Sequence, residues 1–523
     1  MKKIVLFLLI TVFSLNGCKN IDFGDYNYDP IGPNQPSPKD LLTGGMMNFF
    51  NNTGRYELTV PTLNIQWQIQ TVYTDEMQYA DVPVPWRYKY VQVLSNFKAI
   101  IDYYDENPDD IKAGKPENLI AISKIMMAYV FKELADSYGD IPFSEALDKE
   151  NHTPKYDSQI DVYKGIIEML KDARDMIDVA STTNFPVKGD VIYNGNMEKW
   201  QKLANSLILH AALQLSNTSE VNYARNEFNS ALNNPLGVLE ETSDDAWIPY
   251  FSEDYYLKNP YSQMRRADYA LSKEFTDALQ GDGFYGSSPS SCSPTFNTTP
   301  DYRIRIFSTA LDPLDLDHPA DTLDPFTFDG SPYSCSASGG SAQISSLIWK
   351  ADAPLPFFLS SWVYLDRAEA AARGWTSEDF DTMLTNGILR SYEALDKVYN
   401  PIDPAKSRNF VDYKTIYAAA RVADANNGSY GDGNADPKLI VVAEEKWVAM
   451  FPKGFEGWTQ WRRLHYPLLQ PHPNPYNSTG QIPRRYAYPG EEATVNPDNR
   501  AEAVANGLNP PEDRNDSRTR WDQ

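Results

Sequence analysis

The chain has 523 residues and is acidic, with 71 Asp and Glu side chains against 47 Lys and Arg and a formal net charge of −24. Such a surface repels phosphate backbones, which argues against a nucleic-acid-binding protein. The length is ample for a large core, and no Pro/Gly/Ser-rich linker divides the chain, so we expect one elaborated domain over residues 41–523.

The N-terminal segment has the profile of an export signal. Two lysines precede an apolar run over residues 4–13, and Gly17 stands directly before Cys18. A charged start, a short apolar run and a small residue at the cut are typical of a secretory signal peptide, and a bilayer span needs about 20 residues. A cysteine in this position resembles the lipobox of bacterial lipoproteins. We therefore expect residues 1–17 to be a signal peptide and Cys18 to carry a lipid on a tether over residues 18–40; an ordinary signal peptide with a cysteine nearby is the alternative.

The expected lipid explains how so acidic a chain could stay at a membrane. Removal of the signal peptide leaves 45 basic side chains against 71 acidic ones, a formal charge of −26. This charge disfavours an electrostatic hold on anionic lipid headgroups, so the lipid on Cys18 would have to supply the attachment.

Helical periodicity dominates the chain after the tether. From Pro116 to Tyr138 apolar residues recur at helical spacing, and Gly139 stands just past the end. A second stripe follows Ser158, which forms a capping-box start with Asp161 three residues on. Strand-like alternation is sparse, so we expect a mainly α fold. The further amphipathic stretches are 62–79, 88–104, 197–216, 355–373, 378–398, 409–422 and 437–451.

Residues 236–350 break this helical pattern with turn residues, aromatics and acids, which predicts a loop-rich excursion; residues 500–523 read as a polar tail. Cys292 and Cys335 lie in the excursion, and an exported protein permits a disulfide between them, with two unpaired thiols as the alternative.

An acidic loop in the same excursion includes Asp315 and Asp317 and has the oxygen ligands that Ca²⁺ prefers. The loop lacks the Gly and the closing Glu of an EF-hand. We favour a solvated loop there over a metal site.

Several segments carry more specific signals than their composition. They are ADSYGDIPFSEAL (135–147), PKYDSQIDVYKGIIEMLKDA (154–173), EKWQKLANSLILHAALQLS (198–216), FFLSSWVYLDRAEAAARG (357–374), EEKWVAMFPKGFEGWTQWRRLHYP (444–467) and IPRRYAYPGEEATVNPDN (482–499). In this order and with these spacings they resemble the SusD/RagB family of outer-membrane nutrient-binding lipoproteins of Bacteroidetes. The resemblance covers nearly the whole mature chain. His210 and Gln214 depart from it, because the family usually has arginines in that helix.

The resemblance implies a SusD-like helical fold, in which four tetratricopeptide-like helix pairs form a scaffold that supports the other helices and the loops. It also implies a non-catalytic lipoprotein on the cell surface, attached to the outer membrane and acting as a lid on its partner, a SusC-like TonB-dependent transporter. Members of the family capture oligosaccharides or, in some lineages, peptides. No cofactor is expected.

Glycan binding needs flat aromatic faces for the sugar C–H surfaces and polar groups for the hydroxyls. The segment Asp75–Tyr90 matches the family region whose loop aromatics contact ligand, and Trp86 is the strongest candidate in it, with packing against the next helix as the equally weighted alternative. The other candidates in the same segment are Tyr79, Arg87 and Tyr88. Further candidates, each more often structural than ligand-touching, are Trp247, Tyr250, Tyr256 and Asn259 in residues 245–261, and Tyr285 and Tyr333 in the excursion.

One aromatic block is expected to be scaffold instead. It contains Trp447, Trp458, Trp461, Arg462 and Arg463. We expect its tryptophans to be interior and its two arginines to pair with scaffold acids such as Glu456.

The signatures of several enzyme classes are missing from the sequence. The five histidines show no zinc-ligand spacing, and there is no GxSxG, Walker loop or GxGxxG after a strand. We therefore expect a binding protein and no enzyme. A peptide-binding member of the same fold remains an alternative. So does a secreted helical glycoside hydrolase, which would need two carboxylates at a set separation.

Overall fold

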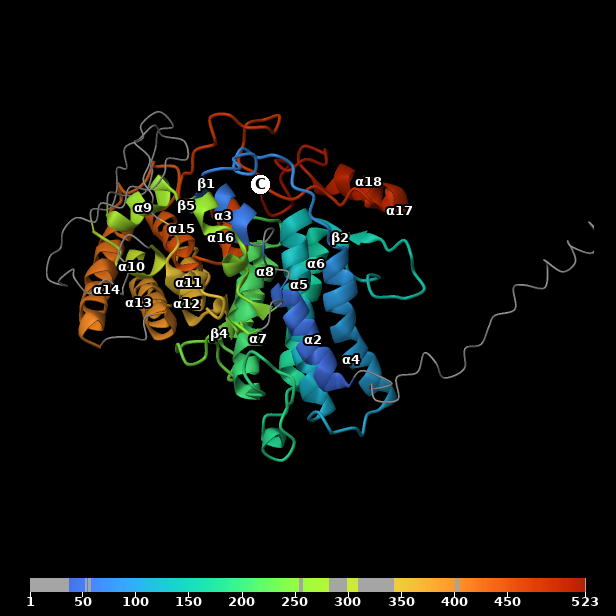
Figure 1. Cartoon of the computed structure of the whole chain (residues 1–523). Coiled ribbons are helices and arrows are strands. Elements are labelled where there is room, and N and C mark those ends of the chain that lie inside the picture. Colours follow the sequence, from blue (N-terminus) through green and yellow to red (C-terminus); the bar gives the residue numbers. More distant parts are fainter. Residues whose placement is uncertain are drawn as a thin grey trace, which may run out of the picture.

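The computed structural model describes residues 37–51, 54, 58–253, 257–281, 299–308, 343–399 and 404–522. Helices dominate these residues and the strands are short (Figure 1). No helix in these ranges is both long and apolar enough to cross a membrane. The α-helices are α2 (Pro38–Asn51), α3 (Val60–Asn64), α4 (Ser95–Glu106), α5 (Pro116–Tyr138), α6 (Gln159–Met176), α7 (Met197–Gln214), α8 (Val221–Leu232), α9 (Lys273–Gln280), α10 (Ile304–Phe307), α11 (Ser346–Trp349), α12 (Ser360–Ala372), α13 (Phe380–Tyr399), α14 (Pro404–Ala425), α15 (Pro437–Ala449), α16 (Gly454–Leu464), α17 (Glu492–Val495) and α18 (Pro497–Gly507). The other elements are the π-helix η3 (Lys89–Leu94), the 3₁₀ turns η4 (Ala180–Thr183), η6 (Pro260–Gln263) and η7 (Arg266–Asp268), and the strands β1 (Gln68–Gln70), β2 (Ile141–Pro142), β3 (Tyr156–Asp157), β4 (Ala246–Ile248), β5 (Tyr269–Leu271) and β6 (Leu355–Phe358).

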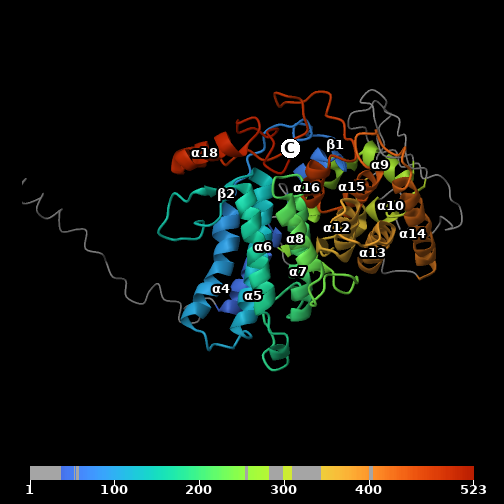
Figure 2. The same ribbon diagram turned by 180° about the vertical axis from the view of Figure 1, so that it is seen from behind.

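Helices α4 to α8 lie side by side and form one half of the scaffold (Figures 1 and 2). Helix α5 ends at Gly139, whose φ of +96° is a conformation that favours glycine. Helix α6 begins after Ser158, whose hydroxyl accepts a hydrogen bond from the backbone N–H of Asp161 at 3.2 Å. Both predicted helices are confirmed. Successive helices in this half pack on one another in pairs, as expected for a tetratricopeptide-like scaffold.

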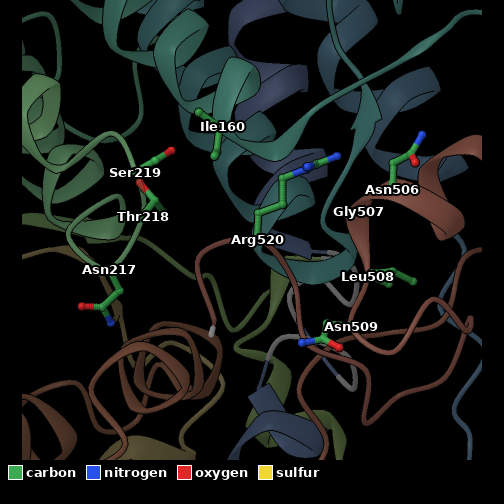
Figure 3. A pocket seen from close by; sticks show the side chains of 9 residues that line it. All are labelled: Ile160, Asn217, Thr218, Ser219, Asn506, Gly507, Leu508, Asn509 and Arg520. Atoms are coloured by element: carbon green, nitrogen blue, oxygen red, sulfur yellow. The ribbon is translucent and has the colours of Figure 1, made fainter.

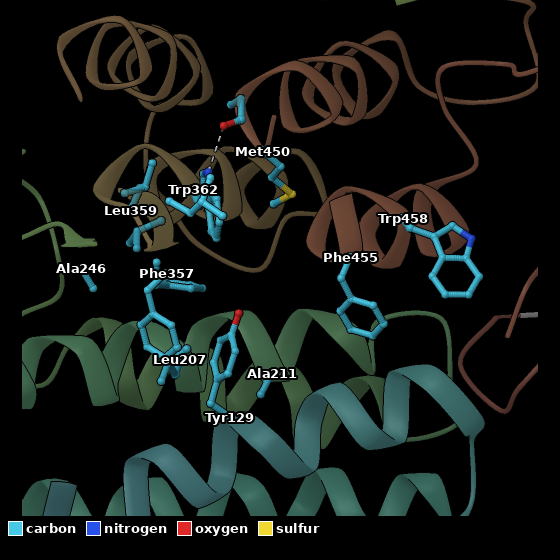
Figure 4. Packing of buried hydrophobic residues seen from close by; sticks show 14 of the residues in the cluster. Tyr129, Leu207, Ala211, Ala246, Phe357, Leu359, Trp362, Met450, Phe455 and Trp458 are labelled. Carbon is cyan, nitrogen blue, oxygen red and sulfur yellow. Dashed lines mark hydrogen bonds between the residues drawn. The ribbon is translucent and has the colours of Figure 1, made fainter. Parts of the chain in front are cut away.

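Helices α12 to α16 form a second group, and the hydrophobic core lies between the two groups (Figure 4). Tyr129 of α5 packs on Phe357 of β6 with ring centroids 4.4 Å apart. The indole Nε1 of Trp362 donates to the carbonyl oxygen of Ala449 at 3.1 Å, which holds α12 against the end of α15. The tryptophans predicted to be scaffold are indeed interior: Trp447, Trp458 and Trp461 are all buried.

Strands in the described residues form three antiparallel pairs, β1 with β5, β2 with β3 and β4 with β6. Strand β1 corrects the helix expected over residues 62–79. Helix α3 ends at Asn64, Gln66 has a positive φ of 58°, and Gln68 pairs with Leu271. The helix expected over 355–373 begins only at Ser360, because the residues before it form β6 and pair with β4.

A buried cluster of charged side chains joins the two helix groups. Its members are Lys132 and Asp136 of α5, His210 of α7, Asp366 and Glu369 of α12, Lys446 of α15, and Glu456 and Arg463 of α16. Glu369 accepts from Arg463 Nη2 at 2.7 Å and from Lys446 Nζ at 2.5 Å. Glu456 accepts from Lys132 Nζ at 3.0 Å. Because these charged side chains come from five different helices, the cluster fixes how the two groups dock.

The expectation that the arginines of α16 pair with scaffold acids is confirmed for Arg463, whose partner is Glu369, and is wrong in naming Glu456 as the partner. Glu456 precedes Arg463 by seven residues, which is about 10 Å along a helix and too far for an ion pair. Arg463 reaches Glu369 instead, and Arg462 donates through Nη1 to the backbone carbonyls of Asp136 at 2.7 Å and Arg484 at 2.6 Å.

Substitution of Glu369 tests how much the cluster contributes to the free energy of unfolding. Burial alone would raise the pKa of Glu369, but Arg463, Lys446 and Arg373 outweigh burial and hold this pKa well below its ordinary range. We expect Glu369→Gln to lower the free energy of unfolding by about 3–5 kcal/mol, because it leaves buried cations without their partner. Urea unfolding measures the change. The control is Glu168→Gln, whose side chain is 61% exposed beside Lys171 and should shift stability by less than about 1 kcal/mol. Equal small effects would contradict a central role for the cluster.

His210 makes the cluster sensitive to pH. Its Nδ1 lies 2.9 Å from Asp366 Oδ2 and its Nε2 lies 3.4 Å from Glu456 Oε2. Burial and Lys132 lower the pKa of His210, but the two carboxylates outweigh them and raise it above the ordinary 6.5. The folded state therefore binds the His210 proton more tightly than the unfolded state. This contribution to stability is fully present below about pH 6.5 and is lost as the pH rises through the raised pKa.

We expect the free energy of unfolding to fall as the pH rises above about 6.5, and the fall to be shallower in His210→Gln, which keeps a hydrogen-bonding side chain but cannot titrate. Urea unfolding of both proteins at several pH values gives the two slopes. Identical slopes would show that His210 is not the group that titrates.

Candidate functional site

A cleft of about 430 Å³ opens where three distant parts of the chain meet. One wall is the start of η3 with the residues just before it, a second is the connection between β2 and β3, and the third is α17. Its lining residues are Trp86, Arg87, Tyr90, Val91, Pro142, Ala146, His152, Pro154, Glu491, Glu492, Val495 and Asn496. The cleft thus contains the strongest sequence candidate, Trp86, together with its neighbour Arg87.

The aromatic floor of the cleft consists of Trp86 and Tyr90, which belong to a larger cluster of rings around Trp86. The ring centroid of Trp86 lies 5.0 Å from that of Tyr138, 5.6 Å from Tyr156, and 5.8 Å from both Tyr90 and Tyr488. Most of these pairs are edge-to-face, the arrangement that aromatic quadrupoles favour. Only 5% of Trp86 is exposed. Trp86 therefore offers the cleft only a small part of its surface and does not present the open flat face that the sequence suggested.

The tyrosine hydroxyls fix this floor. Tyr90 donates to the carbonyl of Pro142 at 2.7 Å, and Tyr156 donates to Glu492 Oε2 at 2.5 Å. Burial, with Glu492 nearby, raises the pKa of Tyr90 and of Tyr156. Both phenols therefore remain protonated donors, and Glu492 keeps one carboxylate oxygen for other partners.

The rim of the cleft is polar and accessible. Arg87, His152 and Glu491 are exposed, and within the described part of the chain their side chains have no hydrogen bond or ion pair. Val91 and Val495 are 55% and 54% exposed beside them. Apolar surface next to unpaired donors and acceptors is the pattern of a small-ligand site. A sugar ring, with C–H faces and hydroxyl edges, matches such a lining.

The two other candidates in this segment have structural roles. Tyr79 is buried, with a positive φ of 68°, and its hydroxyl accepts from the backbone N–H of His472 at 2.7 Å. The half-buried Tyr88 donates to the carbonyl of Asn48 at 3.1 Å. The expectation that Tyr79 is presented on a loop surface is wrong, because its ring and hydroxyl hold two segments together.

The candidates between residues 245 and 261 do not line the cleft either. Trp247 packs edge-on against Tyr399 at 5.8 Å, and the hydroxyl of the buried Tyr250 donates to Phe50 O at 3.3 Å. Asn259 is fully buried, and its Nδ2 donates to the carbonyl of Ala353 at 2.7 Å. These contacts position neighbouring segments.

Several predicted residues lie outside the described residues. They are Cys18, Tyr256, Tyr285, Cys292, Asp315, Asp317, Tyr333 and Cys335. Among the described residues, no group of three or more His, Cys, Asp or Glu side chains could hold a metal ion.

Most of the residues that line the cleft were not predicted from the sequence. His152, Glu491 and Glu492 carry no motif and stand in loops or at the start of a four-residue helix. Their one signal is the placement of 482–499 among the family-like segments. That placement does not indicate which side chains of the segment reach Trp86 and Arg87, which lie some 400 residues earlier in the sequence.

The SusD-like family model, described as starch-binding and associating with the outer membrane, matches residues 30–282 and 295–489. The chain therefore belongs to this family, and the resemblance seen in the sequence is confirmed. Membership supports a glycan-binding role and an association with the outer membrane. Among curated proteins no match is found.

Solved structures share the fold along almost the whole chain. A chitin-binding protein is 23% identical, with a TM-score of 0.71, and the match covers 93% of this chain and 100% of that one. A SusD homologue from Bacteroides fragilis is 21% identical, with a TM-score of 0.69 and coverage of 94% and 100%. A chitin-binding SusD homologue from Flavobacterium johnsoniae is 20% identical, with a TM-score of 0.67 and coverage of 92% and 98%. These likenesses confirm the predicted SusD-like helical fold.

The packing of Trp86 predicts a large effect on stability. Trp86→Ala should lower the free energy of unfolding by about 3–5 kcal/mol, because it leaves a void among four tyrosine rings. Trp86→Phe, which keeps a ring in the cluster, should cost less. The control is Tyr476→Ala, since the Tyr476 side chain is 66% exposed. If urea unfolding shows Trp86→Ala to be as mild as this control, the aromatic floor is not the support that the structure indicates.

Proposed function

We propose that the protein is a non-catalytic binding lipoprotein of the cell surface that captures an oligosaccharide in the Trp86 cleft and delivers it to a SusC-like TonB-dependent transporter. The observation that carries the binding site is the lining itself: an aromatic floor with a polar rim of Arg87, His152 and Glu491 that lacks partners within the described residues. A lipid on Cys18 keeps the protein beside its transporter, and the SusD-like family supports both the ligand class and the membrane.

Starch and chitin oligosaccharides are the ligands to test first. The family model is described as starch-binding, and two proteins of the same fold are described as chitin-binding. The cleft offers a guanidinium, two carboxylates and an imidazole, which can serve the hydroxyl groups of either sugar and the amide of an N-acetylated one. The apolar contact comes from the small exposed part of Trp86 and from Val91 and Val495.

The arrangement of carboxylates favours binding over hydrolysis. A glycosidase needs two carboxyl groups on opposite sides of the scissile bond, about 5–10 Å apart. The carboxylates that line this cleft, Glu491 and Glu492, are adjacent in sequence and belong to the same wall. One of them already accepts from Tyr156. Among the residues that the structure describes, no carboxylate lines the opposite wall to complete a catalytic pair.

Isothermal titration with chitopentaose, maltoheptaose and a tetrapeptide pool tests this function. We expect one of the two glycans to bind, the peptides not to bind, and prolonged incubation to release no new reducing ends. Peptide binding without glycan binding would move the protein to the peptide-capturing class, and glycan turnover that disappears in a single Asp or Glu variant would establish a hydrolase.

Arg87→Ala is the cleanest probe of the cleft, because Arg87 is exposed and its loss removes no side-chain hydrogen bond or ion pair with the described residues. We expect it to weaken the binding of whichever glycan binds by about tenfold or more, since a hydrogen bond to a charged group contributes about 1.5–3 kcal/mol. The melting temperature should not change. The matched control is Arg265→Ala, whose side chain is 76% exposed and lies outside the cleft lining. Equal affinities of the two variants would remove Arg87 from the site.

A further inference from the structure

A second cleft, of about 340 Å³, lies on the other side of α18. It forms where the connection between α7 and α8, the first turn of α6 and the C-terminal segment meet (Figure 3). Figure 3 shows Thr218 and Ser219 on one side of Arg520 and Asn506 on the other. Its lining residues are Ile160, Asn217, Thr218, Ser219, Asn506, Gly507, Leu508, Asn509 and Arg520.

One side of the cleft is fixed by an ion pair. Arg520 donates from Nε to Asp140 Oδ1 at 2.8 Å and from Nη2 to Asp140 Oδ2 at 2.7 Å. The same Asp140 accepts from the backbone N–H of Gln159 at 2.8 Å. A Cβ at Gly507 would stand 2.7 Å from Asp140 Oδ2, so only glycine lets the end of α18 approach so closely. The guanidinium is held in place and its charge is balanced.

The walls are also rigid, yet they leave polar groups open. Asn217 Nδ2 donates to the carbonyl of Arg463 at 2.9 Å, and the backbones of Asn509 and Arg518 exchange two hydrogen bonds at 3.0 and 2.8 Å. In contrast, the side chains of Ser219, Asn506 and Asn509 are exposed and have no hydrogen-bond partner among the described residues, and neither has Arg520 Nη1. Preorganised walls with open donors and acceptors reduce the entropic cost of binding.

The chemistry of this lining selects a neutral, hydroxyl-rich ligand. Its open groups are amides, a hydroxyl and one guanidinium nitrogen whose charge Asp140 already balances. An anion would find little attraction here on a chain whose formal net charge is −24. Within the described part of the chain no aromatic ring lines the cleft, so an aromatic or strongly apolar ligand gains little. The volume is at the lower end of the range for ligand pockets, roughly 300–1,000 Å³, which limits the occupant to one or two sugar units.

The spacing of the two clefts suggests that they act together. Asn496 lines the Trp86 cleft and Asn506 lines the second cleft, and α18 runs between them. Ten residues of α-helix rise about 15 Å. An oligosaccharide of several units could therefore occupy both clefts at once. Two linked contacts raise the overall affinity well above that of either alone.

We propose that the second cleft is a saccharide subsite that takes one or two neutral sugar units, and that with the Trp86 cleft it selects longer oligosaccharides over short ones. This inference rests on the proposed function, because it takes the ligand to be a glycan. Short oligosaccharides bind at the Trp86 cleft alone, and longer ones gain the contacts with Ser219, Asn506 and Asn509.

Titration with chitobiose and chitohexaose, and with maltose and maltoheptaose, tests the length selection. For the sugar that binds, we expect the long form to bind at least about tenfold more tightly than the short one. Asn506→Trp, which fills the cleft, should remove most of this gain and leave the affinity of the short form unchanged. The matched control is Ala505→Trp, which places the same side chain at an exposed neighbouring position outside the lining.

A double variant, Ser219→Ala with Asn506→Ala, provides a test that introduces no bulk and should also reduce the affinity of the long form alone. Equal affinities of the two lengths in the unmodified protein, or an Asn506→Trp variant indistinguishable from Ala505→Trp, would overturn the subsite while leaving the proposed function intact. The absence of any glycan binding would contradict the proposed function and this inference with it.

Discussion

The structure depends above all on the buried ion pair between Glu369 and Arg463. Both side chains are almost fully buried, and two short contacts join them. A buried charge is costly unless its partner is in place, so the pair specifies one docking of α12 on α16. Lys446 extends the pair to α15, and Glu456 with Lys132 and His210 extends it to α5 and α7. The two helix groups thus have one way to fit together.

The docking of α16 in turn positions the C-terminal segment that builds both clefts. Arg462 of α16 donates to the backbone carbonyls of Asp136 and Arg484, and so clamps the start of this segment to the end of α5. Tyr488 continues the attachment by donating to the carbonyl of Asp140 at 2.8 Å. Helix α17 then walls the Trp86 cleft, and the end of α18 walls the second one. A scaffold of paired helices holds rigid loops at its surface, where binding sites tend to be found.

Much of this fold could be predicted from the sequence because its helices carry their own signals. The stripe from Pro116 to Tyr138, the Gly139 stop and the Ser158 cap all act within a few residues, and all appear in the structure. The predictions fail where residues far apart in the sequence determine the local structure. Residues 68–70 form a strand because β5, some 200 residues later, pairs with them. Arg463 finds Glu369 because of helix docking, which periodicity does not encode.

The candidate site shows the same difference between local features, which could be predicted, and long-range contacts, which could not. The sequence pointed to Trp86 and Arg87 through their prolines, their aromatic neighbours and the family resemblance. It did not show that four tyrosines surround Trp86, nor that Glu491 and His152 line the same cleft as Arg87, since the walls of this cleft come from segments that are far apart in the sequence. The structure therefore shows an aromatic floor with a polar rim in place of the expected open aromatic platform.

A crystal structure of the protein with the glycan that binds in titration would show directly whether the Trp86 cleft holds the sugar. We expect sugar density in the cleft between η3 and α17, against Trp86 and within hydrogen-bond distance of Arg87 and Glu491. Density for the sugar on another face, with this cleft unoccupied, would contradict this expectation.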